Sequence, residues 1–175
     1  NNIIIRVGST KFDFKQSVSL EPNKINHIDD FILAASTHIG EDEVVINSFK
    51  RLKKEFLDLK LIIVPRHPER AKTIKQILSN NKMNFELSSD LDFNTKENDI
   101  IVISATGCLN SLYKLSKASF IGGSLFSRYG GHNVIEAAFN ESPFIVGPYM
   151  KNFEDVLNSF LRRDACLQIE KPDEL

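Results

Sequence analysis

A pair of glycines followed by histidine and asparagine is the most informative pattern in this sequence. Gly130 and Gly131 stand just before a helical stretch. His132 and Asn133 fall in its first turn, and Glu136 follows one turn later. Main-chain N–H groups at a helix start suit a phosphate, and glycine lets the backbone approach it closely. The pattern favours a phosphate site with a ribose-binding carboxylate over a plain turn in which Asn133 only caps the helix.

An arginine and a histidine between two prolines form a second candidate. Arg66 and His67 directly follow the apolar run 61–64, and the flanking prolines restrict the backbone there. A guanidinium at the end of a buried strand can pair in bidentate fashion with phosphate or carboxylate. The alternative is a surface arginine paired with Glu69.

Two more polar groups follow apolar runs. Ser36, Thr37 and His38 could bind phosphate or sugar through hydroxyl and imidazole groups, although Thr37 could equally cap the helix expected near residue 40. The stretch 104–107, which ends in Gly107, follows another run. Ligands of open parallel sheets bind outside the carboxyl ends of the strands, where all these residues are expected to lie.

Several other kinds of site are excluded by spacing. The histidines lack metal-ligand spacing, and Cys108 and Cys166 stand far apart without a Cys/His pattern, so we expect no metal, no disulfide and no cofactor. Neither glycine-rich signature of nucleotide triphosphatases or dinucleotide dehydrogenases is present.

Short apolar runs alternate with amphipathic stretches from residue 31 onward. This alternation predicts an α/β fold, a Rossmann-like doubly wound parallel sheet flanked by helices. The expected strands are 31–35, 61–64, 99–103, 118–121 and 143–146, with weaker candidates at 85–87 and 166–169. The expected helices are 41–56, 68–80, 108–115, 131–140 and 153–162.

The whole chain has the size of one domain, with 175 residues, and a net charge of −1. This charge argues against nucleic acid as a partner, and no apolar stretch is long enough to span a bilayer. We expect 31–175 to form the domain and 1–30 to be an interdomain linker or edge segment. The first residue is not Met and the chain ends as a helix begins at Pro172, so we interpret it as a soluble fragment.

Six ordered motifs between about residues 31 and 170 resemble those of bacterial 3-deoxy-D-manno-octulosonic acid (Kdo) transferases, which are GT-B glycosyltransferases. The motifs are Ala34-Ala35-Ser36-Thr37-His38 with Gly40-Glu41, Pro65-Arg66-His67-Pro68-Glu69-Arg70, Gly122-Gly123-Ser124-Leu125, Gly130-Gly131-His132-Asn133, Glu136, and Gly147-Pro148 with Asn152-Phe153.

The resemblance implies the carboxy-terminal, CMP-Kdo-binding half of such an enzyme. The family transfers Kdo to a lipid A precursor in lipopolysaccharide biosynthesis, at the cytoplasmic face of the inner membrane, by metal-independent inverting transfer. The general base, the acceptor site and the membrane association belong to the amino-terminal half, so the fragment alone is expected to be inactive. The residues implied for donor binding are Ser36, Thr37, Arg66, His67, Gly107, Gly130, Gly131, His132, Asn133 and Glu136.

Two departures from the family pattern stand out. Residues 104–109 read Ser-Ala-Thr-Gly-Cys-Leu where the family has a stretch like Asp-Thr-Met-Gly-Glu-Leu, and the loop 124–130 is one residue longer. Two other functions stay open: a GT-B enzyme that uses a UDP-sugar, and a flavodoxin-like interaction module whose glycines are only turns.

Overall fold

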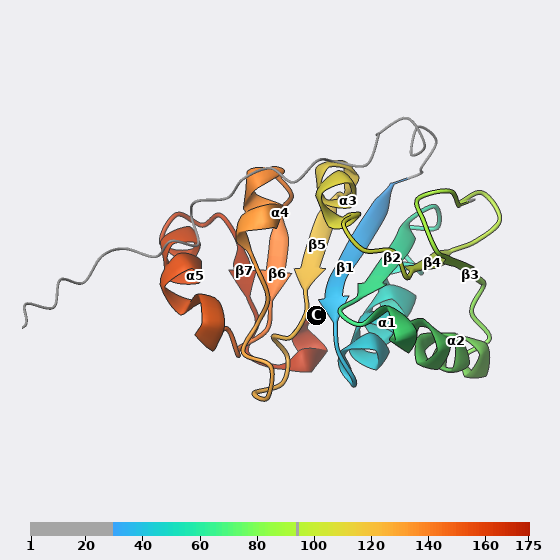
Figure 1. The fold of residues 1–175 in the computed structure, drawn as a ribbon, viewed down its shortest axis with the longest axis horizontal. Helices are drawn as coiled ribbons and strands as arrows, with labels where there is room; N and C mark the ends of the chain where they lie inside the picture. Colours follow the sequence, from blue (N-terminus) through green and yellow to red (C-terminus); the bar gives the residue numbers. More distant parts are fainter. Residues whose placement is uncertain (1–29, 94) are drawn as a thin grey trace, which may run out of the picture.

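The computed structural model describes residues 30–93 and 95–175, and these form a parallel sheet of seven strands with helices on both faces (Figure 1). The strands are β1 (Phe31–Thr37), β2 (Lys60–Pro65), β3 (Phe85–Ser88), β4 (Ile100–Ile103), β5 (Ala118–Ile121), β6 (Phe144–Val146) and β7 (Leu167–Gln168). The helices are α1 (Glu41–Leu52), α2 (Ala71–Asn80), α3 (Leu109–Leu115), α4 (Ile135–Phe139) and α5 (Glu154–Leu161), with 3₁₀ turns η3 (Pro68–Arg70), η4 (Lys151–Phe153) and η5 (Pro172–Glu174).

The strand order is β3-β4-β2-β1-β5-β6-β7, with every neighbouring pair parallel. The chain moves outward from β1 in one direction through β2, then returns to β5 on the other side of β1. The boundary between β1 and β5 is therefore the point where the direction of winding reverses. In a sheet of this kind the crevice at that point, outside the carboxyl ends of the strands, is the usual ligand site.

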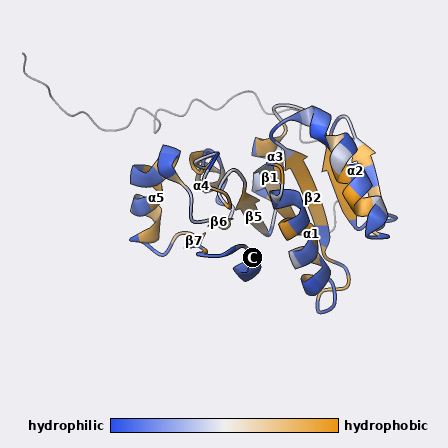
Figure 2. Cartoon of the chain, turned by 90° about the horizontal axis from the view of Figure 1, so that it is seen from below, coloured by the Kyte–Doolittle hydropathy of each residue, from blue (hydrophilic) through white to orange (hydrophobic). Residues whose placement is uncertain are grey.

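Two apolar clusters hold the helices on the two faces of the sheet. One packs α1 and α2 against one face, through residues such as Ile46, Phe49 and Ile74. The other packs α3, α4 and α5 against the opposite face, with Leu112 and Leu157 among its members. The central strands are hydrophobic along their length while the helices present hydrophilic outer sides (Figure 2). A sheet buried on both faces explains why its strands are continuous apolar runs rather than alternating ones.

The fold class predicted from the sequence is confirmed, and all seven expected strands are present. The boundaries differ most at two helices. The stretch 131–140 is helical only at Ile135–Phe139, and the stretch 41–56 is helical only as far as Leu52. The interpretation of 1–30 as a linker lies outside the described residues, apart from Asp30.

No helix within residues 30–93 and 95–175 has both the length and the apolar character needed to cross a membrane.

Candidate functional site

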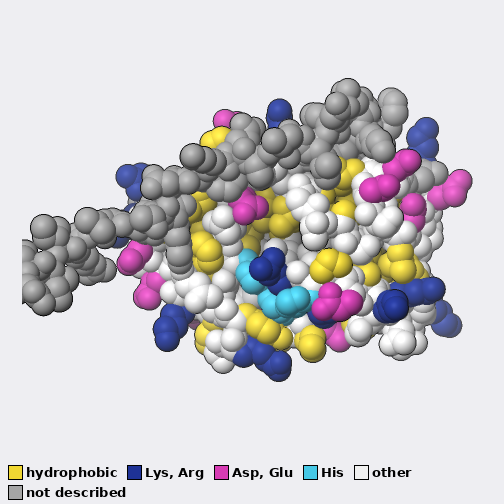
Figure 3. Space-filling model, in the orientation of Figure 1, with side chains coloured by type: hydrophobic (Ala, Val, Ile, Leu, Met, Phe, Trp, Pro, Cys, Tyr) yellow, Lys and Arg dark blue, Asp and Glu magenta, His cyan; other side chains and the backbone are white. Residues whose placement is uncertain are grey.

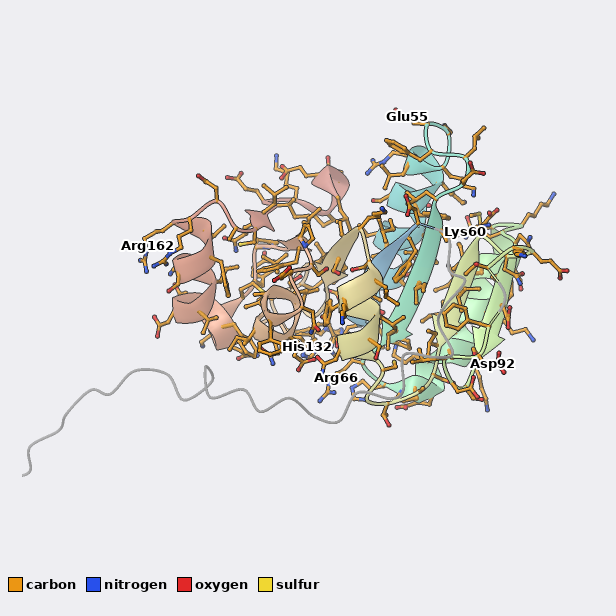
Figure 4. All side chains as sticks on the ribbon, turned by 90° about the horizontal axis from the view of Figure 1, so that it is seen from above. Glu55, Lys60, Arg66, Asp92, His132 and Arg162 are labelled. Carbon is orange, nitrogen blue, oxygen red and sulfur yellow. The ribbon has the colours of Figure 1, made fainter. Side chains whose placement is uncertain are left out.

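The carboxyl ends of β1, β2 and β5 bring three histidines and an arginine together at the reversal point of the sheet. His38 follows β1, Arg66 and His67 follow β2, and His132 lies in the loop between β5 and α4. Arg66 and His132 lie near one another at the same end of the sheet (Figure 4). Histidine side chains gather beside basic and acidic ones on this face of the molecule (Figure 3). The fold thus brings three distant candidate motifs together, those at residues 36–38, 66–67 and 130–133.

His38 and His132 form a hydrogen-bonded pair at the centre of this cluster. Their Nε2 atoms lie 2.7 Å apart, although the residues are 94 positions apart in the sequence. The ring of Tyr129 stacks on His38 with 3.8 Å between centroids, and His67 meets His38 edge-on at 5.6 Å. The ring of His38 is therefore fixed by contacts on several sides, and only 7% of the residue is exposed.

Both members of the pair are electrically neutral at pH 7. Burial lowers the pKa of His38 to about 4, and the nearby His132, His67, Arg70 and Arg66 reinforce this shift. Burial also lowers the pKa of His132 to about 4, with contributions from Arg66 and His67. In a neutral pair joined through Nε2, one ring donates its Nε2–H and the other accepts, so the two rings hold opposite tautomers.

The basic side chains around the pair differ in how far they are already engaged. Arg70 donates to the buried carboxylate of Asp42 and to the main-chain oxygen of Thr37, the latter at 3.0 Å. Arg128 lies over the Tyr129 ring, with 5.2 Å between its guanidinium carbon and the ring centroid. Arg66 is exposed. Oε1 of Glu69 lies 3.9 Å from Nδ1 of His67, and among the described residues no ion pair joins Glu69 to Arg66. Arg66 is therefore the guanidinium most available to a ligand.

The carboxylate of Glu41 binds the main chain of the loops that follow β1 and β5. It is fully buried and accepts four main-chain hydrogen bonds, two on each oxygen. The donors are the N–H groups of His38 (2.9 Å), Gly123 (2.7 Å), Ser124 (2.9 Å) and Leu125 (3.0 Å). Burial raises the pKa of Glu41, and the four donors oppose that shift. Because both oxygens act as acceptors only, this arrangement requires the ionised form.

Glu41 therefore occupies the N–H groups that follow β5. Those of Gly123, Ser124 and Leu125 point at its carboxylate and are not free for a phosphate. A Cβ at Gly122 would lie 2.5 Å from the main-chain oxygen of Ser36 and 2.8 Å from Glu41 Oε2. This glycine is needed for the close approach of the two strand ends.

The expectation of a helix start at Gly131 is wrong. Gly131 donates its N–H to the main-chain oxygen of Gly123 at 2.7 Å, and α4 begins only at Ile135. Gly130 and Gly131 have φ values of 74° and 81° and pack against Asn152 and Met150, where a Cβ would collide. These contacts lie far along the chain, so local sequence could not reveal them.

Asn133 stands one residue before Val134, the N-cap of α4. Its Oδ1 accepts from the N–H of Ile135, the first residue of α4, at 3.0 Å. Its Nδ2 donates to Oε1 of Glu136 at 3.0 Å. The Asn133 amide therefore orients the Glu136 carboxylate through Oε1 and does not bind Oε2.

The remaining predicted residues lie at different depths. Ser36 ends the regular part of β1 with a φ of 55°, where the pairing of β1 with β2 shifts by one residue. Thr37 is fully buried, and its hydroxyl faces Asp42 without a good hydrogen-bond geometry. Thr37 does not cap α1, whose N-cap is Gly40 without a side-chain bond. Gly107 is exposed beyond β4, two strands from β1.

The structure thus joins Arg66, His67 and His132 in one cluster, while Thr37 and Gly131 are turned to structural contacts. The sequence alone does not predict the structural roles of Glu41 and Tyr129. Glu41 binds the main chain of residues 123–125, and Tyr129 stacks on His38, so both roles depend on partners far away in the sequence. Among the described residues, no group of three or more His, Cys, Asp or Glu side chains could hold a metal ion.

No protein-family model matches the sequence, but several curated proteins do. The chain is 38% identical over 182 residues to a bifunctional glycosyltransferase/methyltransferase of Fusobacterium nucleatum, covering 96% of the chain and 27% of that protein. It is 34% identical over 176 residues to a 3-deoxy-D-manno-octulosonic acid transferase of Rickettsia felis, covering 98% of the chain and 38% of that enzyme. The enzyme of that name from Aquifex aeolicus is 35% identical over 146 residues, which are 83% of the chain and 40% of the enzyme.

A solved structure agrees with these relatives. The carboxy-terminal CMP-Kdo binding domain of WaaA from Acinetobacter baumannii superposes with a TM-score of 0.74 and 27% identity, over 83% of this chain and 75% of that one. The fold is a Rossmann-like domain of the kind that forms the carboxy-terminal half of GT-B proteins. Within that class, the chain is homologous to the carboxy-terminal part of the Kdo transferases, and the resemblance seen in the motifs is confirmed. The chain spans between 27% and 40% of the length of the three curated relatives named above.

Proposed function

We propose that this domain binds CMP-Kdo and is the donor-binding half of a Kdo transferase. The observation that carries the proposal is the cluster of Arg66, His67 and the His38–His132 pair at the reversal point of the sheet. Ligands of this fold bind at that point, and a guanidinium with imidazoles suits a phosphate. The similar domain from Acinetobacter is itself described as CMP-Kdo binding.

The phosphate is held mainly by side chains in this proposal. The N–H groups after β5 are engaged by Glu41, and that of Gly131 by Gly123. Arg66 therefore supplies the main positive charge, and His67 and His132 supply further hydrogen bonds. Ser36, at the mouth of the same crevice, is the hydroxyl that can join them.

The nucleoside lies along the start of α4 in this arrangement. Asn133 orients the carboxylate of Glu136 through one oxygen, and the other oxygen can accept from a ribose hydroxyl. The cytosine contacts the main chain of residues 65–67 or the loop that contains Gly107.

The relatives named above are longer than this chain, which spans between 27% and 40% of their length. We propose transfer of Kdo to a lipid A precursor with inversion, a general base in an amino-terminal domain, and no activity of this domain alone. The acceptor site and the contact with the cytoplasmic face of the inner membrane belong to that domain as well.

The test is a residue-level map of nucleotide binding by amide NMR shifts. CMP should move signals at Arg66, His67, His132 and Glu136, and UDP should do so only at higher concentration. Cytidine, which lacks the phosphate, should bind much more weakly. A preference for UDP would favour a UDP-sugar transferase, and no response to either nucleotide would favour an interaction module.

A further inference from the structure

The His38–His132 pair has one ring nitrogen that is ready to take a proton. A single N–H lies between the two Nε2 atoms, 2.7 Å apart. Each neutral ring carries one proton, so the donor through Nε2 has an unprotonated Nδ1 and the acceptor has a protonated Nδ1. No residue among those described hydrogen-bonds to Nδ1 of either ring. Both Nδ1 atoms are thus without a hydrogen-bond partner among residues 30–93 and 95–175, and one of them is an unprotonated acceptor.

The charges around the pair oppose protonation while no ligand is bound. From the loop after β2 and from η3, Arg66, His67 and Arg70 face the rings, and each lowers the pKa of His38. The loop after β5 contributes Tyr129, which stacks on His38 and carries Arg128 on it.

The carboxylates in this neighbourhood are engaged elsewhere. Glu41, on α1, binds main-chain N–H groups, including that of His38 but not its ring. Asp42 is paired with Arg70, and Glu69 lies beside His67. On α4, Glu136 accepts from Asn133 through one oxygen. Among the described residues, the pair therefore has cations on several sides, while the carboxylates of Glu41, Asp42 and Glu69 are engaged by other groups.

We infer that the His38–His132 pair takes up one proton from solvent when the donor phosphate binds, and then holds the phosphate as a hydrogen-bonded cation. This inference rests on the proposed function. The proton forms an N–H bond at the empty Nδ1, and no other bond is broken. Both Nδ1 atoms are then donors, and the Nε2 contact becomes a charge-assisted hydrogen bond.

The size of the effect follows from electrostatics. A phosphate supplies the missing negative charge and offsets the repulsion from Arg66. An opposite charge within about 4–6 Å shifts a pKa by about 1–3. Phosphate binding should therefore raise the proton affinity of the pair about ten- to thousandfold. A cation formed in this way faces the phosphate as charge gathers on it during departure of the sugar, which is where a fixed positive group is most useful.

The experiment follows the ring nitrogens of both histidines by ¹⁵N NMR across a pH titration of this domain, without ligand, with saturating CMP and with saturating cytidine. CMP should move the midpoint of the pair upward by at least one pH unit, and cytidine should leave it unchanged. The inference is overturned if CMP moves amide signals but not the midpoint, or if cytidine moves it equally. Absence of CMP binding would instead overturn the proposed function.

A substitution tests the electrostatic origin of the coupling in the free protein. Arg66→Gln removes a cation that disfavours protonation of both rings, so the midpoint of the unliganded pair should rise. An unchanged midpoint would mean that the Arg66 charge does not act on the rings, and such a result would contradict the electrostatic basis of the inference. Because Arg66 is exposed, this variant should fold normally.

Discussion

Oε2 of Glu41 lies 2.7 Å from the main-chain nitrogen of Gly123, although 82 positions separate the two residues. The contact joins the first turn of α1 to the loop after β5 and so holds the carboxyl ends of β1 and β5 together. Acidic residues in the first turn of a helix are normally solvated and favoured by the helix dipole. Here the carboxylate is instead the buried acceptor around which the loop is arranged.

Glu41→Gln should therefore destabilise the domain strongly. The amide keeps one oxygen, but its NH₂ group faces N–H donors that need an acceptor, and each buried donor left unpaired costs about 1–3 kcal/mol. We expect urea denaturation to show a loss of about 2–5 kcal/mol in the free energy of unfolding. The control is Glu43→Gln on the exposed side of the same helix, which should stay within about 0.5 kcal/mol of the parent. Equal stability of the two variants would refute the role of Glu41.

The fold was predictable because its signals are local. Runs such as 61–64 and 118–121 are apolar throughout, and only a sheet covered on both faces buries such runs completely. The candidate site was predictable in outline for a related reason, since polar residues after parallel strands must meet at one edge. Arg66 and His132 came together on that basis alone.

The contacts within the site were not predictable from local patterns. Gly131 reads as a helix start, but its N–H is used by Gly123 and its position is fixed by Met150. Glu41 reads as a solvated acid, and His38 has no local partner. The partners of Glu41 and His38 lie more than 80 positions away in the sequence. The partners of Gly131 are closer in the sequence but belong to other loops. Periodicity and capping rules describe neither kind of contact.

The histidine pair should make stability depend on pH in the absence of nucleotide. The folded pKa of about 4 for His38 and for His132 lies below the ordinary 6.5, so the unfolded chain binds more protons between these values. The free energy of unfolding should therefore fall as the pH drops from about 6.5 toward 4, by roughly 1.4 kcal/mol per pH unit for each proton excluded.

The comparison that isolates this effect is urea denaturation of His132→Gln at several pH values. In this variant the dependence of the free energy of unfolding on pH should be smaller by the contribution of about one proton. Lys75→Gln, on the exposed side of α2, should keep the full pH dependence. A slope that His132→Gln leaves unchanged would mean that the pair is not the source.

Arg66→Ala should weaken the binding of CMP without weakening the fold. Hydrogen bonds to charged groups contribute about 1.5–3 kcal/mol, so the Kd measured by calorimetry should rise about 10- to 150-fold. The exposed side chain makes little contribution to packing, and the free energy of unfolding should change by less than about 0.5 kcal/mol. Lys72→Ala, an exposed cation on α2, is the matched control and should bind as the parent does. An equal affinity for Arg66→Ala would remove this residue from the site.

Gly131→Ala should cost more stability than Gly107→Ala, although both glycines have a left-handed backbone, with φ of 81° and 77°. A Cβ at Gly107 meets nothing within 4 Å, so only the backbone term of about 1–2 kcal/mol applies there. A Cβ at Gly131 would overlap Sδ of Met150, and overpacking adds about 1–3 kcal/mol. Urea denaturation of both variants should therefore show a larger loss for Gly131→Ala, about 2–5 kcal/mol in all. Equal losses would mean that the loop moves away from Met150 freely, and then the glycine pair would not be held in place by packing.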